Sequence, residues 1–224
     1  MDIYPRVPES VSKRLCELNI NRDSERLKLL KLPHERLVDL LQVLDGSKKI
    51  DYFYKLDIQL YVWKKLFQDV EADSFISAHI YSKGDSREYD PAKNGQNIIK
   101  HGISFGEVTS YSKRFGTLSI PCPDEDDETR YVIFSDLAPG LNGENLCLPI
   151  PSTIQEPEVY TLSVVQILDL KPRFISSRIM SRKKFSKNMK NAFKGIYDDD
   201  PIKKKDFVSE CVHILRRDLF KRKT

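Results

Sequence analysis

The sequence predicts an α+β protein in which helices come first and last and an antiparallel sheet lies between them. Two observations lead to this prediction. Residues 1–75 have leucine-rich, helix-like patterns, and residues 89–194 then follow the order helix, helix, four strands, helix. Consecutive strands with helices grouped at either end are typical of this class. We divide the chain into a helical N-terminal domain (1–75), an α+β domain (76–195) and a C-terminal helical extension (196–224).

Length and composition indicate a folded protein. The chain has 224 residues, of which 40% are hydrophobic and 31% charged, so it can bury a core and is too balanced for a disordered or fibrous protein. It has no apolar run that could span a bilayer, and its N-terminus lacks the pattern of a secretory signal. The four cysteines have no CxxC spacing, as is common for reduced thiols. We therefore expect a cytoplasmic protein without membrane contact.

The N-terminal region contains three predicted helices. Segments 24–32 and 33–45 are leucine-rich, Pro33 suits a first helical turn, and Asp45-Gly46 is a helix stop. Over 51–71, apolar residues recur at alternating spacings of three and four. That spacing predicts one apolar stripe facing a core, made of Phe53, Leu56, Leu60, Trp63, Phe67 and Val70.

The central region starts with a predicted strand at 75–81 and a turn at 82–87. Asp90-Pro91 is a favourable helix start, and Gly102 a favourable residue after the last turn. Ser104 and Glu107 match a capping box, which predicts a second helix towards residue 114. Strands are expected at 117–120, 130–135, 159–168 and 173–179, with a long proline-containing loop over 137–157.

The C-terminal part is basic and helical. Ser181 can cap a helix to Phe193, and a terminal helix over 202–220 has an apolar side made of Phe207, Val208, Cys211, Leu215 and Leu219. From residue 171 onward, the sequence contains 17 Lys and Arg but only 6 Asp and Glu. This segment therefore has a net charge of +11, in a chain whose total net charge is +4. Segment 171–194 contains nine basic residues and no acidic one. This charge predicts binding of phosphates or of an acidic partner, with a merely solvated face as the alternative.

Three blocks of residues 89–194 resemble the BrnT family of bacterial toxins, which are ribonucleases of the RelE-like superfamily encoded beside an antitoxin. The first block is Tyr89-Asp90, Lys93, Asn97, Lys100-His101-Gly102, Ser104-Phe105 and Glu107. The second is Arg130-Tyr131-Val132-Ile133, and the third Arg173-Phe174-Ile175-Ser176-Ser177-Arg178. The resemblance implies a RelE-like fold, cleavage of RNA without metal or cofactor, and a cognate antitoxin partner.

Cleavage of this kind needs cations for the phosphate and a base for the 2′-hydroxyl. Arg130, Arg173 and Arg178 are the candidate phosphate ligands, because guanidinium groups donate paired hydrogen bonds to phosphoryl oxygens. An ideal strand places Arg173 and Arg178 on opposite faces unless a bulge intervenes. We assign Arg178 to the site, since it is nearer the basic helix, whereas Arg173 can pair structurally.

Acid and base candidates are His101, Glu107, Lys100 and Tyr131. Each has a structural alternative: Lys100 and His101 suit a helix C-terminus, Glu107 completes the capping box, and Tyr131 points into the core. RNA contacts are predicted for Lys93, Asn97, Lys100, Arg182, Lys183, Lys187 and Lys190, although exposure alone also explains Lys93 and Asn97.

Other sequence patterns leave two further functions open. The chain has no GxxxxGK[ST], GxGxxG or HExxH motif, and acidic residues 124–128 are read as a solvated turn rather than a metal site. Lys184 stands where the BrnT family carries Glu, so a non-catalytic RNA- or protein-binding module is the second hypothesis. A helical interaction protein supported by the toxin-like fold is the third. The oligomeric state is open, and a homo-oligomer is compatible with the sequence.

Overall fold

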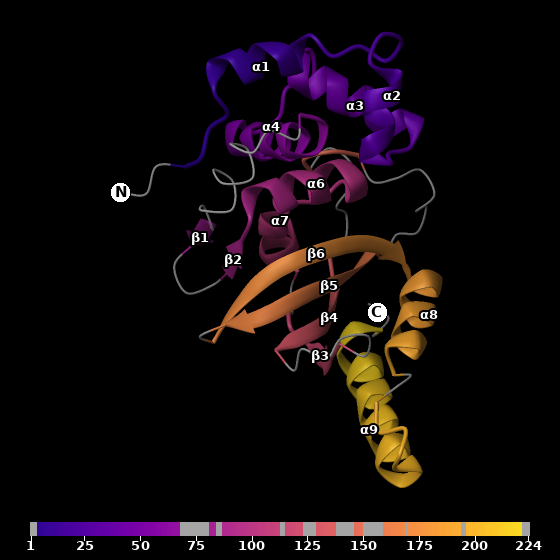
Figure 1. Cartoon of the computed structure of the whole chain (residues 1–224). Helices are drawn as coiled ribbons and strands as arrows, with labels where there is room; N and C mark the ends of the chain where they lie inside the picture. The colour runs from indigo at the N-terminus through magenta and orange to yellow at the C-terminus, as the bar shows by residue number, and fades with distance from the viewer. Residues whose placement is uncertain are drawn as a thin grey trace.

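The computed structural model describes residues 4–67, 81–83, 87–112, 115–122, 129–137, 146–149, 159–168, 170–193 and 196–220. These residues form an α+β structure in which helices lie on both faces of a sheet (Figure 1). The helices are α1 (Glu9–Cys16), α2 (Ser24–Leu27), the 3₁₀ turn η1 (Lys28–Leu30), α3 (His34–Asp45), α4 (Tyr52–Leu66), α6 (Pro91–His101), α7 (Phe105–Tyr111), α8 (Arg182–Ala192), α9 (Pro201–Ile214) and the π-helical turn η2 (Leu215–Leu219). The strands are β1 (Tyr81–Lys83), β2 (Arg87–Tyr89), β3 (Leu118–Pro121), β4 (Arg130–Asp136), β5 (Val159–Leu168) and β6 (Lys171–Ser181).

Side chains fix the helix ends at α6 and α7 where the sequence predicts them. The Asp90 carboxylate accepts from the backbone N–H of Ala92 at 2.8 Å and of Lys93 at 3.3 Å. Gly102 ends α6 in the left-handed conformation with φ of 76°. The capping box of Ser104 and Glu107 is formed in both directions. Ser181 occupies the N-cap position of α8 but makes no side-chain cap hydrogen bond.

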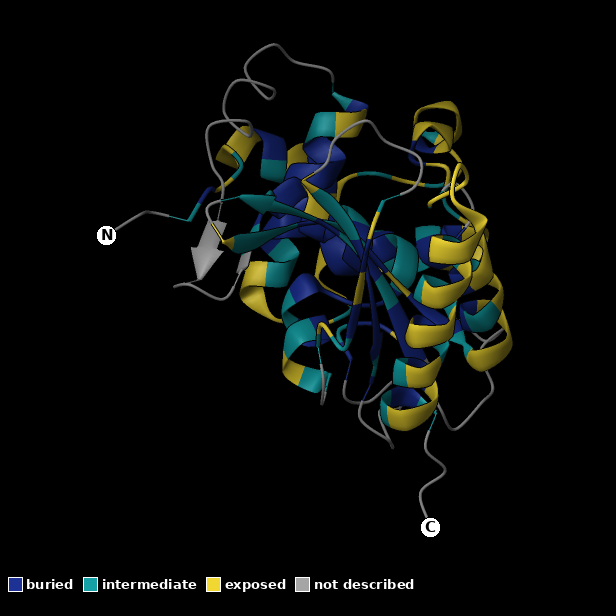
Figure 2. Ribbon diagram, turned by 90° about the horizontal axis from the view of Figure 1, so that it is seen from below, coloured by how far each residue is buried: buried dark blue, intermediate teal, exposed yellow. Residues whose placement is uncertain are grey.

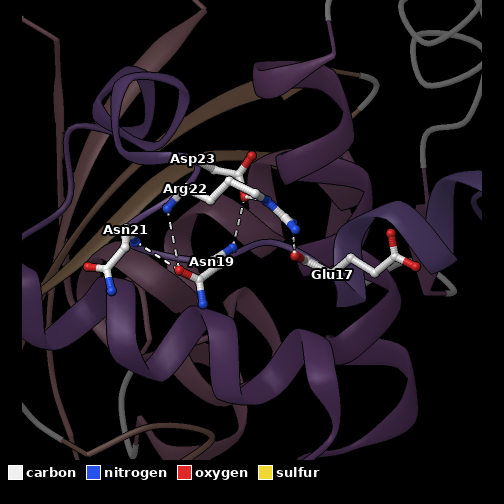
Figure 3. A network of polar contacts seen from close by, with 5 residues as sticks. All are labelled: Glu17, Asn19, Asn21, Arg22 and Asp23. Atoms are coloured by element: carbon white, nitrogen blue, oxygen red, sulfur yellow. Dashed lines mark hydrogen bonds and ion pairs between the residues drawn. The ribbon is translucent and has the colours of Figure 1, made fainter.

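A local polar network closes the exposed connection between α1 and α2 (Figure 3). The Asn19 side chain accepts from the N–H of Asn21 at 2.9 Å, and Asp23 accepts from the Asn19 N–H at 2.9 Å. Arg22 donates to the Glu17 carbonyl and to Asp23. All of these partners lie within residues 17–23, so the network orders this connection by itself.

Helix α4 is buried on almost every side, so the prediction of a single apolar stripe is wrong. All residues from Leu56 to Trp63 are buried, including Asp57 and Gln59, whereas Phe53 of the predicted stripe is 51% exposed. The reason is its position, because α1, η1 and α3 cover one side of α4 and α6 covers the other (Figure 1). The continuation predicted to residue 71 lies outside the described residues beyond Phe67.

The six strands of the described chain form a mixed sheet in the order β1-β2-β6-β5-β4-β3. The four-strand antiparallel part, β6-β5-β4-β3, is confirmed, but β2 pairs with β6 in parallel, so the prediction of a purely antiparallel sheet is wrong. Strands β1 and β2 form an antiparallel pair in which Tyr81 opposes Tyr89. Residues 82, 83 and 87, expected in a turn, therefore belong to strands, and residues 75–80 and 84–86 lie outside the described residues.

Each face of the sheet has its own core. On one face, Ile133, Val165, Phe174 and Ile179 pack with Phe105 of α7. On the other, α8, α9 and η2 cover Phe134, Tyr160 and Met180, and the predicted apolar side of the terminal helix lies in this cluster. The outward faces of α8 and α9 remain exposed (Figure 2).

The N-terminal helices share a third core with α6. This cluster joins Leu40 and Leu60 to Ile98 and Ile99, and it includes Leu148 from the described part of the predicted loop. The boundary near residue 75 lies outside the described residues, and separate folding of residues 1–75 stays a prediction. Among the described residues, no helix is both long and apolar enough to cross a membrane.

Candidate functional site

His101, the last residue of α6, is partly buried among positive charges. Its pKa is lowered from 6.5 to about 4, mainly by burial and then by the charges of Arg178, Lys100, Arg36 and Lys184, in that order. The imidazole is therefore neutral at physiological pH. A neutral imidazole has a free nitrogen that accepts a proton.

Four different elements bring these charges to His101. Arg36 comes from α3, Lys100 from α6, Arg178 from β6 and Lys184 from α8. Arg36 is neutralised within the fold, since it is buried and donates to Asp39 at 3.1 Å and to the Pro149 carbonyl at 2.7 Å. We call the remaining four residues, Lys100, His101, Arg178 and Lys184, the His101 cluster.

The cations of the His101 cluster are not balanced by carboxylates in the described part of the chain. No ion pair joins Lys100, Arg178 or Lys184 to an Asp or Glu among those residues. Burial lowers the pKa of Lys100, and the charges of Lys65, Lys31 and Arg178 lower it further. The carbonyls at the end of α6 favour cations nearby, which explains Lys100 but not the approach of Arg178 and Lys184 from other elements. The cluster can therefore hold an anion.

A β-bulge determines how the arginines are arranged on the sheet. The register of β5 and β6 shifts between Val164 and Val165, so Arg173 opposes Gln166 and Arg178 opposes Leu162. Gln166 and Leu162 are an even number of residues apart, which places Arg173 and Arg178 on the same face. The prediction that Arg173 and Arg178 lie on opposite faces of the sheet is therefore wrong. The reason is a β-bulge, which that prediction allowed as an exception.

The three arginines nevertheless do not form one phosphate site. Arg130 and Arg173 both oppose Gln166 across the sheet, whereas Arg178 lies about 13 Å farther along the strand direction, at roughly 3.3 Å per residue. Arg173 pairs with Glu88 of β2 at 2.9 Å, as its structural alternative predicts. Arg178 is exposed and belongs instead to the His101 cluster.

Asn97 has a structural role, so its prediction as an RNA contact is wrong. It is 3% exposed, its side-chain oxygen accepts from the Ser177 N–H at 2.8 Å, and its nitrogen donates to the Ile103 carbonyl at 2.8 Å. Beyond Phe174, β6 has no neighbouring strand on this side among the described residues. Asn97 therefore satisfies an edge N–H of β6 and holds that edge beside the end of α6.

Glu107 is also used by the fold. It is 6% exposed, and its two carboxylate oxygens accept from the backbone N–H groups of Ser104 and Cys147, each at 2.6 Å. Burial raises its pKa. Both oxygens are occupied, so Glu107 joins the start of α7 to the 146–149 segment rather than serving as an accessible base.

The remaining predicted RNA contacts lie on exposed surfaces. Lys93 is exposed on α6, and Arg182, Lys183, Lys187 and Lys190 are exposed on α8, whose opposite side is anchored by Phe185 and Met189. Arg182 also lies over the Phe220 ring at 4.8 Å. Tyr131 packs with the core on the α7 face, as predicted. The exposed side of α8 thus continues from Lys184 as a basic surface.

Sequence reasoning missed the contributions of Arg36, Lys31 and Lys65. No spacing links these residues to the end of α6, and only the packing of the N-terminal helices on α6 brings Arg36 near His101 and brings Lys31 and Lys65 near Lys100. In the described ranges, no group of three or more His, Cys, Asp or Glu residues could hold a metal ion; residues 124–128 lie outside these ranges. Comparison with family models, curated proteins and solved structures finds no match for this chain.

Proposed function

We propose that this protein is a BrnT-like endoribonuclease that cleaves single-stranded RNA by attack of the 2′-hydroxyl, without a metal, and that an antitoxin protein covers its basic surface. The observation behind this proposal is that the positive charges of Arg178, Lys100 and Lys184 all act on the partly buried imidazole of His101. His101 and Arg178 come from two separate blocks of the BrnT resemblance. The charge and the resemblance thus point to the same residues.

The electrostatics of the cluster suit this reaction. Neutral His101 takes the proton of the 2′-hydroxyl while the 2′-oxygen forms its bond to phosphorus and the bond to the 5′-oxygen breaks. A bound phosphate neutralises the neighbouring cations, so it raises the pKa of His101 when a base is needed. Arg178 stabilises the charge on the phosphoryl oxygens. Lys100, an ammonium with a lowered pKa, supplies the proton to the 5′-oxygen.

A non-catalytic RNA-binding module is the second candidate. The observation that favours it is the structural use of Glu107, because both of its carboxylate oxygens accept from backbone N–H groups and the site has no accessible carboxylate base among the described residues. In this second candidate function, the basic surface of α8 still binds RNA, but the protein does not cleave it.

The test is cleavage of single-stranded RNA by the full chain in the presence of EDTA. We expect cleavage by the wild type and a loss of about 10²–10³-fold in rate in Arg178→Ala, because one fixed donor to the developing charge is removed. Arg216→Ala is the matched control, because Arg216 is an exposed arginine of η2 that is neither a predicted RNA contact nor among the charges acting on His101. RNA binding without cleavage by the wild type would select the second candidate. Cleavage by Arg178→Ala at the wild-type rate would remove Arg178 from the site.

A further inference from the structure

A second group of lysines lies where three N-terminal and central elements meet, at the ends of η1, α4 and α6. The Tyr61 hydroxyl of α4 donates to the Leu30 carbonyl at 3.5 Å and also hydrogen-bonds the Gln96 side chain of α6. Lys31 follows Leu30 directly. Lys65 and Lys100 each lie one helical turn beyond Tyr61 and Gln96.

The helices α4 and α6 run in the same direction, which brings their C-terminal ends together. Gly95 lies against Asp57 and Ile58, and Lys100 lies close enough to Lys65 to feel its charge. Residue 95 of α6 therefore lies beside residues 57 and 58 of α4, and residue 100 lies near residue 65, so residue numbers increase in the same direction along both helices. Lys31, Lys65 and Lys100 therefore gather at one end of the helical layers, beside Arg178.

The lysines of this group have no carboxylate partner among the described residues. Lys31 and Lys65 are exposed and Lys100 is partly exposed. No ion pair neutralises any of them in that part of the chain. Each lysine interacts favourably with the carbonyls at a helix end. The three positive charges nevertheless repel one another, and this repulsion costs free energy unless an anion binds between them.

We infer that Lys31 and Lys65 form a second phosphate-binding subsite, which holds the RNA backbone next to the phosphate bound by Arg178. Lys100 lies between the two subsites, because both Arg178 and the two N-terminal lysines act on it. The N-terminal helical region is then part of the RNA surface, rather than an independent interaction domain. This inference rests on the proposed function, since it extends the same site along the same ligand.

The test compares two double variants of the full chain by RNA affinity as a function of salt. The probe is a fluorescent single-stranded RNA of about twelve nucleotides, within the usual range for such binding sites, with 2′-O-methyl riboses that cannot be cleaved by attack of the 2′-hydroxyl. Lys31→Gln with Lys65→Gln should lower the log–log salt slope by about 1.4, since each phosphate contact contributes ~0.7. Lys13→Gln with Lys49→Gln is the control. It removes the same charge from exposed positions of the same region, and neither lysine acts on Lys100.

Three outcomes separate the inference from the proposed function. A reduced slope in the first variant, with the control unchanged, supports the subsite. An unchanged slope in both variants, with tight binding by the wild type, overturns the subsite and leaves the proposed function standing. If the wild type does not bind RNA, both are overturned.

Discussion

Gly95 of α6 lies directly against the backbone of Asp57 in α4. A Cβ atom at position 95 would lie 2.0 Å from the Asp57 carbonyl oxygen and 2.6 Å from the Ile58 nitrogen. The two helices can approach this closely only because residue 95 has no side chain. This crossing sets how α4, and the N-terminal helices packed on it, sit over α6.

Gly95→Ala should therefore destabilise the protein strongly. The added methyl meets backbone atoms, which cannot move aside as a flexible side chain can, so we expect a loss of about 3 kcal/mol or more in the free energy of unfolding. Gly116→Ala is the comparison, because Gly116 has φ of 84° but nothing within 4 Å of the added atom. Its cost should be about 1–2 kcal/mol. Equal losses in urea denaturation would contradict the close crossing.

Asp57 should make stability fall with rising pH. It is fully buried, accepts from the Tyr4 hydroxyl and from Asn94 at 2.6 Å, and burial raises its pKa from 3.8 to about 8. The folded state then holds a proton that the unfolded state has released, so stability decreases from about pH 4 to about pH 8. The lowered pKa of His101 has the opposite effect, but only below pH 6.5.

His101 therefore makes no contribution to the pH dependence between pH 6.5 and 8, where Asp57 still does. There the free energy of unfolding should fall by up to about 1.4 kcal/mol per pH unit in the wild type. Asp57→Asn should flatten this dependence, whatever its own stability, because the group that titrates is gone. Urea denaturation at several pH values measures both slopes. Equal slopes in the two proteins would show that Asp57 is ionised in the folded state.

His101 should report the charges around it. NMR titration of its imidazole should give a pKa near 4 in the wild type. Arg178→Gln should raise this pKa towards 6.5, because the largest neighbouring charge is removed, and Lys184→Gln should raise it less. Lys187→Gln, on the same helix but not among the charges that act on His101, should leave it unchanged. A titration insensitive to Arg178 would place that arginine away from the cluster.

Asn97 and Lys93 should behave differently although they lie one turn apart on α6. Asn97→Ala leaves the Ser177 N–H and the Ile103 carbonyl without their partner, so we expect a loss of at least ~2 kcal/mol. Lys93→Ala removes an exposed side chain and should change stability by less than ~0.5 kcal/mol. Thermal unfolding of the two variants makes the comparison. A neutral Asn97→Ala would contradict its role at the edge of β6.

Local signals predicted much of the fold. Asp90-Pro91, Gly102 and the pair of Ser104 and Glu107 act within a few residues, and the structure has each helix end where they indicate. Strand β5 has its predicted bounds, Val159–Leu168. What escaped prediction depends on distant partners. The spacing of residues along the sequence does not indicate three features of the fold. These are the bulge opposite Val164, the parallel pairing of β2 with β6, and the burial of α4 on both sides.

The positive charge of the candidate site could be predicted from the sequence, but not which residues form the site. A run of basic residues indicates an anion, and Arg178 was singled out within it. The side chains of Asn97 and Glu107 have the right chemistry for RNA, yet buried backbone groups use them first. Arg36, Lys31 and Lys65 lie far away in the sequence and approach α6 only through packing.

The parallel pairing of β2 with β6 has a consequence for the order of folding during synthesis. Its ion pair joins Glu88 to Arg173, which are 85 residues apart in the chain. Contacts of such long sequence separation form late and slow the search for the native state. Helices α1 to α4, α6 and α7 can leave the ribosome and pack before β6 exists, but Arg178 reaches His101 only when β6 docks. The charged cluster is thus assembled only after β6 and α8 have been synthesised, so a chain that ends before β6 lacks Arg178 and Lys184.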